Sequence, residues 1–298
     1  IAGGTVMADL ALTGTNKITN ITRFTGSPSR LSGTNSIELG GSTVLTASRN
    51  VENNLSGGAE LIISGGITNS AASTLTIYGS GNTVINSAYN AGTGASGLQM
   101  AGTGIVTMTA ASTATGALTA SRGTISLEGG AGAWTAGTIT LNTNGVLRLD
   151  NSVSNNNDRL GTGAFAMQGG VLNLIGNNTA EVAGAMTVNG IMGTINMSGS
   201  GSNTLTFASM NFANSGSSLD LTGISGLGAT NKLLVSGAIQ VGGANWTNAI
   251  LPRALITGDF ASYDLANGIV PFGAYNSSNN LNSAASTDTM EVTASAGL

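Results

Sequence analysis

The chain contains no cysteine and no histidine, and only 7% of its 298 residues are charged. The absence of cysteine excludes a disulfide framework and thiol chemistry, and it fits a bacterial protein that is exported and folds outside the cytosol. The absence of histidine removes the commonest general base and metal ligand. The nine basic residues are scattered and the net charge is −4. We therefore expect no nucleic-acid partner, because no basic patch is present to neutralise phosphates.

No apolar run approaches the roughly 20 residues that a membrane span requires, so we expect no transmembrane segment. Aromatic residues make up only 4% of the chain, but 41% is hydrophobic and glycine contributes 46 residues. Disordered chains combine few apolar residues with many charges, and this composition is the reverse. A core of alanine, valine, leucine and isoleucine is thin, which is typical of stacked sheets. The chain begins at Ile1, and we expect a processed or excerpted segment of a longer protein.

Alternation of apolar and polar residues recurs along the chain, whereas runs of strong helix formers are rare. Such alternation predicts short strands with one buried face. Glycine, asparagine or serine bounds most of them, as tight turns require. Typical segments are GVLRLDN (145–151), GVLNLIG (170–176), NTLTFAS (203–209) and NKLLVSG (231–237).

The spacing of these strands predicts a solenoid. Leu205, Leu219 and Leu233 follow one another at intervals of fourteen, and we expect them to form one ladder in the core. Elsewhere the interval stretches, as it does between Leu147 and Leu172. Near-fixed periods of short strands indicate stacked coils. The predicted fold is an all-β, right-handed parallel β-helix. With roughly 20 residues per coil it would have about 15 coils and be about 70 Å long.

The alternative fold is a β-sandwich array built from hairpins. It predicts Asn-Gly or Asp-Gly turns, but Asn-Gly occurs only at 144–145, 189–190 and 267–268, and Asp-Gly is absent. Three regions are expected: a strand-rich N-terminal segment over 1–100, a repeat-bearing β-helix over 101–244, and a capping or junction segment over 245–298. Large residues gather in the last of these, including Trp246, Tyr263 and Tyr275.

The repeats carry a family resemblance. GVLRLDN and GVLNLIG, then NTLTFAS and NKLLVSG, then ITGDFASYDLANGIVPF (256–272), resemble in their order the autotransporter-associated β-strand repeat proteins, which are large bacterial surface proteins. The segment ATGALTASRGTISLEG (114–129) resembles the short repeat of that family, and the match covers residues 100–275. The resemblance implies a secreted β-helical surface protein without assigned catalytic residues.

The group of residues that most resembles a catalytic site is a polar segment, residues 150–159, between the strands GVLRLDN and GVLNLIG. This polar island contains Asp150, Asp158, Arg159 and four asparagines. Two carboxylates can cleave a glycosidic bond, but no aromatic sugar platform is near. We interpret the island as a loop in which an Asp–Arg pair fixes the turn. Stacked asparagine and threonine side chains are expected to satisfy backbone groups at the corners of the coils.

Three other kinds of site are weaker hypotheses. Glu128, Asp150 and Asp220 are a possible calcium site, but calcium takes six to eight oxygens and no calcium-loop motif is present. Lys17 or Lys232 could form an isopeptide bond with an asparagine beside a buried acid. Trp134, Trp246, Tyr263 and Tyr275 could stack on sugars, but we expect corner packing or end caps. We therefore expect no catalytic, cofactor-binding or metal-binding residues.

The sequence favours a structural protein over a binding module or an enzyme. The expected function is part of an extracellular fibre, stalk or coat that forms by head-to-tail association, located outside the cell or on the bacterial surface. A glycan-binding adhesin is the alternative, with surface glycans as its partners. A polysaccharide-degrading enzyme is a third hypothesis, and we expect no enzymatic activity.

Overall fold

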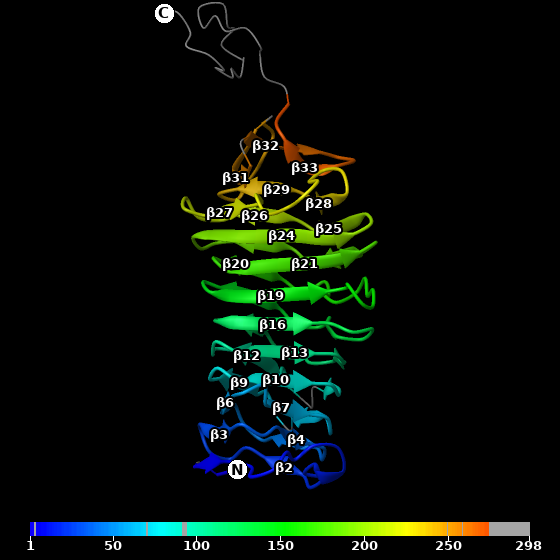
Figure 1. Cartoon of the computed structure of the whole chain (residues 1–298). Coiled ribbons are helices and arrows are strands. Elements are labelled where there is room, and N and C mark those ends of the chain that lie inside the picture. The colour runs from blue at the N-terminus through cyan, green and yellow to red at the C-terminus, as the bar shows by residue number, and fades with distance from the viewer. Residues whose placement is uncertain (3, 70, 91–93, 249, 258, 274–298) are drawn as a thin grey trace, which may run out of the picture.

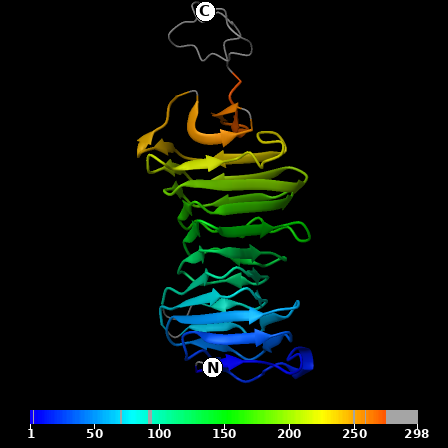
Figure 2. The same ribbon diagram turned by 60° about the vertical axis from the view of Figure 1, so that its left-hand side comes forward.

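The computed structural model describes residues 1–2, 4–69, 71–90, 94–248, 250–257 and 259–273. In this part the chain winds into stacked coils that form an elongated rod, with the N-terminus at one end (Figures 1 and 2). The only helical element in the described residues is a single 3-10 turn, η1 (Gly14–Asn16). Within them, no helix has the length and apolar character that crossing a membrane requires.

The strands form the faces of the rod. The first face is sheet A: β1 (Thr5–Val6), β3 (Ser29–Gly33), β6 (Arg49–Leu55), β9 (Thr74–Tyr78), β12 (Gly97–Met100), β15 (Leu118–Ala120), β18 (Ile139–Asn142), β20 (Phe165–Gln168), β23 (Met186–Val188), β26 (Met210–Phe212), β29 (Ile239–Val241) and β30 (Ala244–Asn245). The second is sheet B: β4 (Ile37–Leu39), β7 (Glu60–Ile63), β10 (Asn82–Ile85), β13 (Ile105–Met108), β16 (Gly123–Leu127), β19 (Gly145–Asp150), β21 (Val171–Asn177), β24 (Met192–Ser200), β27 (Ser218–Asp220), β31 (Leu251–Ile256), β32 (Asp259–Asp264) and β33 (Gly268–Pro271).

The third face is divided between two sheets. Sheet C holds β2 (Thr22–Arg23), β5 (Thr43–Leu45), β8 (Ile67–Asn69), β11 (Tyr89–Asn90), β14 (Ala111–Ser112) and β17 (Ala133–Trp134). Sheet D holds β22 (Ala180–Ala183), β25 (Asn203–Phe207) and β28 (Asn231–Val235). Between them, one coil contributes only an isolated parallel bridge from Trp134 to Leu160.

Each coil passes once through the three faces, and nine coils run from β3 to β28. Neighbouring coils pair in parallel, which confirms the predicted β-helix and shows that the sandwich alternative is wrong. The expected number of coils is also wrong, because many coils are longer than the expected repeat and because the residues before β3 and after β28 lie outside the nine coils. The register partners Leu98 and Leu118 bound a short coil, but the partners Ile139 and Phe165 bound a longer one that includes the polar island. At about 4.8 Å per coil the stack is about 40 Å long.

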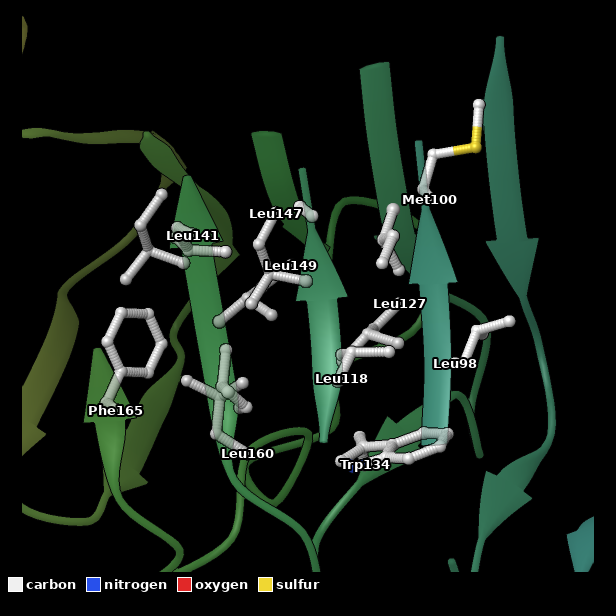
Figure 3. Close-up of a cluster of buried hydrophobic side chains, with 14 of the residues drawn as sticks. Leu98, Met100, Leu118, Leu127, Trp134, Leu141, Leu147, Leu149, Leu160 and Phe165 are labelled. Atoms are coloured by element: carbon white, nitrogen blue, oxygen red, sulfur yellow. The ribbon is translucent and has the colours of Figure 1, made fainter. Parts of the chain in front are cut away.

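Two continuous rows of apolar side chains fill the interior between sheets A and B, and Figure 3 shows their central part. Because side chains alternate across a strand, every second residue points inward and stacks on its register partner in the next coil. Each member is at most 6% exposed. The row on sheet A is Leu75, Leu98, Leu118, Ile139, Phe165, Met186, Met210 and Ile239; the row on sheet B is Ile63, Ile85, Met108, Leu127, Leu149, Leu174 and Met197.

The predicted ladder of Leu205, Leu219 and Leu233 is wrong in one member. Leu205 and Leu233 are register partners in sheet D, whereas Leu219 belongs to sheet B and pairs with Gly193 and Ala254. All three side chains are fully buried. The fourteen-residue step therefore connects two faces of the same core. The true coil repeat is the longer interval, such as that between the partners Leu147 and Leu172.

A row of glycines lets successive coils approach closely at one corner of the rod. A Cβ atom on Gly137 would lie 1.9 Å from the carbonyl oxygen of Gly116 in the previous coil. The same contact would be 2.2 Å between Gly163 and Gly137, and 2.1 Å between Gly184 and Gly163. No side chain fits at these distances, so the glycine content reflects backbone stacked on backbone.

The two ends of the rod differ. At the N-terminal end β1 and β2 are the outermost strands of sheets A and C in the described residues. At the other end the parallel order stops, because β30 pairs with β29, and β32 and β33 follow β31, in antiparallel fashion. Between the ends, β12 pairs in parallel with both β9 and β15, so the stack continues across the expected boundary at Met100. The division into three regions stays a prediction, and Tyr275 lies outside the described residues.

Replacing Leu219 by alanine should lower the free energy of unfolding by about 2–5 kcal/mol, because the side chain is fully buried and leaves a cavity. Urea denaturation followed by circular dichroism measures the change. Leu265→Ala is the matched control, since this leucine is 91% exposed and its loss should change stability by less than about 0.5 kcal/mol. Equal destabilisation by the two variants would contradict the assignment of Leu219 to the core.

Candidate functional site

The outer surface of sheet B carries a cluster of charged side chains around Arg148 of β19. Its Nε donates a hydrogen bond to Ser126 Oγ at 2.9 Å, and its Nη2 lies 3.3 Å from Glu128 Oε2. Asp150 Oδ2 is 3.9 Å from Arg148 Nε. Ser126 and Arg148 are register partners on β16 and β19, so the stacking of the coils places the cluster. One guanidinium thus lies beside two carboxylates.

A shallow hollow of about 300 Å³ adjoins this cluster, and its lining includes Glu128, Asp150, Ser152 and Val153. The Asp150 carboxylate is already engaged: its Oδ1 accepts hydrogen bonds from the backbone N–H of Ser152 and from the Ser152 hydroxyl. Such a local turn is the usual role of an aspartate at the start of a loop. The geometry favours a structural role for Asp150, which begins the loop that follows β19.

Arg159 lies at the end of that loop and is fully buried. Its Nε donates to Asn151 Oδ1 at 2.7 Å, and its Nη1 donates to the Gly132 carbonyl at 2.7 Å. Its Nη2 contacts three further carbonyl oxygens, those of Gly129, Asp150 and Ser154, at 2.7, 2.8 and 3.0 Å. Burial lowers the pKa of Arg159, and the nearby carboxylates, Glu181 foremost, oppose this. The guanidinium fastens the loop to the coil below.

Glu181 of β22 lies on the other side of Arg159 and is also fully buried. Its Oε2 accepts from the backbone N–H of Arg159 at 3.2 Å, and its Oε1 accepts from that of Leu160 at 2.8 Å. These two N–H groups lie at the gap between sheets C and D. The carboxylate replaces the backbone carbonyls of a regular strand pair. Burial raises the pKa of Glu181 to about 7, although the two backbone hydrogen bonds act in the opposite direction.

A polar ladder stacks at the corner beyond the loop, as expected for the corners of the coils. Asn151 Nδ2 donates to Thr179 Oγ1, and the Thr179 N–H donates to Asn203 Oδ1. Asn203 Nδ2 in turn donates to Asn231 Oδ1 at 3.0 Å. These four side chains are at most 5% exposed. This confirms the prediction that asparagine and threonine satisfy polar groups at the corners.

The structure keeps the polar island as a loop but changes the role of its residues. Asp158 is exposed, and the guanidinium of Arg159 binds carbonyl and amide oxygens. The predicted Asp–Arg pair is therefore wrong: a buried arginine finds enough acceptors in the curled backbone. Sequence reasoning also missed Glu181, which occupies an inward position in register with Leu205. A charged residue among alternating apolar residues was the available signal.

The hypothetical calcium ligands are not brought together. Glu128 and Asp150 flank Arg148, but Asp220 is on β27 and pairs with Thr194 at a different position along the strands. In the part of the chain that the structure describes, no group of three or more acidic residues is arranged to hold a metal ion.

Lys17, Lys232 and Trp134, which the sequence singled out, each contact other residues of the chain. Lys232 Nζ lies 3.2 Å from Asn267 Oδ1, and both residues are half-buried. Asp264, the acid next to Asn267, is exposed, so it is not the buried acid that an isopeptide bond needs. Lys17 pairs with Glu38 at 3.8 Å. Trp134 is fully buried, with its ring centroid 5.4 Å from that of Tyr89.

Two aromatic residues near the C-terminal end, Trp246 and Tyr263, are partly buried against the core. The Trp246 indole N–H donates to the Ile250 carbonyl, and the Tyr263 hydroxyl bonds to both the N–H and the carbonyl of Val235 on β28. Both rings pack against the core. They therefore pack at the C-terminal end of the rod, as expected, and both also line a surface hollow of about 330 Å³, so the alternative of stacking on sugars stays a prediction.

Comparison with known proteins gives no relative: no family model, no curated protein and no solved structure matches the chain.

Replacing Arg159 by methionine should lower the free energy of unfolding by about 3–5 kcal/mol, because four carbonyl oxygens and the Asn151 amide oxygen lose a buried charged donor. Urea denaturation measures it. Arg122→Met is the matched control, since this arginine is exposed, and its effect should stay below about 1 kcal/mol. Similar stability of the two variants would show that the guanidinium does not fasten the loop.

The raised pKa of Glu181 predicts a pH dependence of stability. Between pH 4.5 and 7 the folded protein keeps a proton on Glu181 that the unfolded chain releases, so stability should fall as pH rises and level off above pH 7. The fall attributable to this group is about 3 kcal/mol. The measurement compares urea midpoints of the wild type and Glu181→Gln over this range. The difference between them should change with pH, and a constant difference would contradict the prediction.

Proposed function

We propose that this chain is a structural segment of an extracellular bacterial fibre, stalk or coat, in which rods associate head to tail. The observation that supports the proposal is the parallel stack, in which no further described strand pairs with the outer edge of β1. A β-helix extends by adding coils to an exposed edge, and exposed edges are the natural sites of pairing with another chain.

The N-terminal coil has the chemistry of such a contact surface. No strand of the described residues lies outside β1 or β2. Ile1 occupies part of the β2 edge, where its N-terminal ammonium donates to the Arg23 carbonyl and its own carbonyl accepts from the Thr25 N–H, so β1 supplies the open backbone edge. Three large apolar side chains of this coil are exposed: Met7 at 68%, Leu10 at 75% and Ile21 at 59%. A second coil would pair with the backbone edge and remove these side chains from water.

The opposite end offers a different surface. β30 and β33 are the terminal strands of sheets A and B there, and Phe260 and Leu265 are exposed at 57% and 91%. Because the two ends differ, a contact between them is heterologous, and heterologous contacts propagate into filaments unless the rotation closes a ring. With only 7% charged residues, little repulsion opposes the approach of two rods.

The location and family are part of the proposal. The resemblance of residues 100–275 to the autotransporter-associated β-strand repeat proteins supports a secreted surface protein, and the β-solenoid is compatible with a β-helix repeat protein. The engaged carboxylates around Arg148 support a structural role. The proposal therefore assigns no enzymatic activity to the chain.

The decisive experiment is electron microscopy of the purified chain, with light scattering over a range of protein concentrations. The intact chain should form filaments that lengthen with concentration. Deleting residues 1–14 should leave soluble single rods, because it removes the outer strand of sheet A and Leu10.

A substitution guards against a folding defect in the deletion. Leu10→Lys places a charge on the exposed N-terminal coil and should shorten or abolish filaments while circular dichroism stays unchanged. Val153→Lys is the control, because this side chain is 95% exposed on the loop at the side of the rod. A dispersed monomer at high concentration, or unchanged filaments in Leu10→Lys, would overturn head-to-tail association.

A further inference from the structure

A second hollow, of about 370 Å³, lies on the outer surface of sheet A near the N-terminal end. It is lined by Pro28, Asn50, Glu52, Tyr78 and Gly79. Glu52 and Tyr78 are register partners on β6 and β9, and Arg30 on β3 is the partner of Glu52 on the other side. The volume is at the lower end of the range for small-ligand sites, about 300–1,000 Å³.

Tyr78 supplies an aromatic surface to this hollow. It is 39% exposed, and it is the only aromatic side chain among the large exposed apolar residues of the described part of the nine coils. The other aromatic side chains between β3 and β28, such as Tyr89, Trp134 and Phe165, are buried. A tyrosine ring combines an apolar face with a polar hydroxyl, which suits a ligand that is itself apolar on one side and polar at its rim.

Glu52 supplies a fixed acceptor. Its Oε2 accepts from Arg30 Nε at 2.8 Å, and its Oε1 accepts from Asn54 Nδ2 at 2.9 Å. These hydrogen bonds, that from Arg30 first, lower the pKa of Glu52, so it is ionised at neutral pH. Each carboxylate oxygen has two lone pairs, so both can still accept a further hydrogen bond from a hydroxyl group.

Asn50 supplies an amide that can both donate and accept. It precedes Glu52 by two residues on β6 and therefore points to the same outer face. Within the described residues, the structure gives its side chain no hydrogen-bond partner, although the amide lines the hollow. The hollow thus combines an exposed ring, an oriented carboxylate and an unengaged amide.

We propose that this hollow binds a neutral pyranose unit of a glycan. The C–H face of a sugar ring would lie on Tyr78, and its hydroxyl groups would donate to Glu52 and exchange hydrogen bonds with Asn50. The charges of Arg30 and Glu52 cancel in their ion pair, and the carboxylate rather than the guanidinium lines the hollow. A uronic or sialic acid would bring a second negative charge toward Glu52, which excludes acidic sugars.

The test is a glycan array with neutral and acidic oligosaccharides, followed by calorimetric titration of the sugar that binds. The wild type should bind neutral glycans. Tyr78→Ala should weaken binding at least tenfold, Tyr78→Phe should retain most of it because the ring remains, and Asn50→Ala should weaken it severalfold. Phe260→Ala is the matched control, because it removes an exposed ring outside the hollow and should leave the affinity for the glycan unchanged.

Circular dichroism and urea denaturation of each variant separate loss of the site from loss of the fold. Absence of any glycan binding by the wild type, binding of acidic glycans alone, or equal binding by Tyr78→Ala would each overturn the proposal. The site is independent of head-to-tail assembly, so Leu10→Lys should bind the same glycan with unchanged affinity.

Discussion

Backbone hydrogen bonds between successive coils hold this molecule together, and they require every coil to return to the same place about 4.8 Å further along the axis. The inward rows of leucine, isoleucine and methionine follow, because each side chain must fill the same slot as its partner in the next coil. The glycine row at Gly116, Gly137, Gly163 and Gly184 follows as well, since the backbone itself occupies the space of a side chain there. Loops can vary in length under the same requirement, provided that the strand after each loop stays in register with its partner in the neighbouring coil.

The third face shows what happens when a coil departs from this rule. The loop after β19 leaves only Leu160 to continue sheet C, and the regular pairing of backbone groups stops. The side chains of Arg159 and Glu181 then provide the hydrogen-bond donors and acceptors that a paired strand would provide: Arg159 donates to the Gly132 carbonyl, and Glu181 accepts from the Leu160 N–H. Two buried ionisable groups are expensive to desolvate, and they occur at the one place on this face where the strand ladder is interrupted within the described coils. Their position follows from the geometry of the gap.

The sequence reveals the parallel β-helix because alternation and turn residues are local signals, and the corner ladder of Asn151, Asn203 and Asn231 follows from the same reasoning. The coil length is less accessible. The fourteen-residue step between Leu205 and Leu219 is a real spacing, but it joins two faces, and only pairing in space distinguishes a face-to-face step from a coil repeat. The burial of Arg159 and the exposure of Tyr78 cannot be predicted from the sequence for a related reason. Both depend on neighbours from adjacent coils, which are distant in the sequence.

The gap between sheets C and D also affects how the rod comes apart. In a stack where each coil touches only its neighbours, stability is a sum of couplings between adjacent layers, and the molecule divides first at the weakest coupling. On the third face, the layer that ends at Leu160 is joined to the next by the Glu181 carboxylate, by asparagine side chains of the loop after β19, and by one backbone hydrogen bond from the Gly184 N–H to the Gly161 carbonyl. Sheets A and B pair without interruption across the same layer. On the third face the coupling therefore comes mainly from side chains and varies with the protonation of Glu181, whereas strand pairing supplies it within sheets C and D.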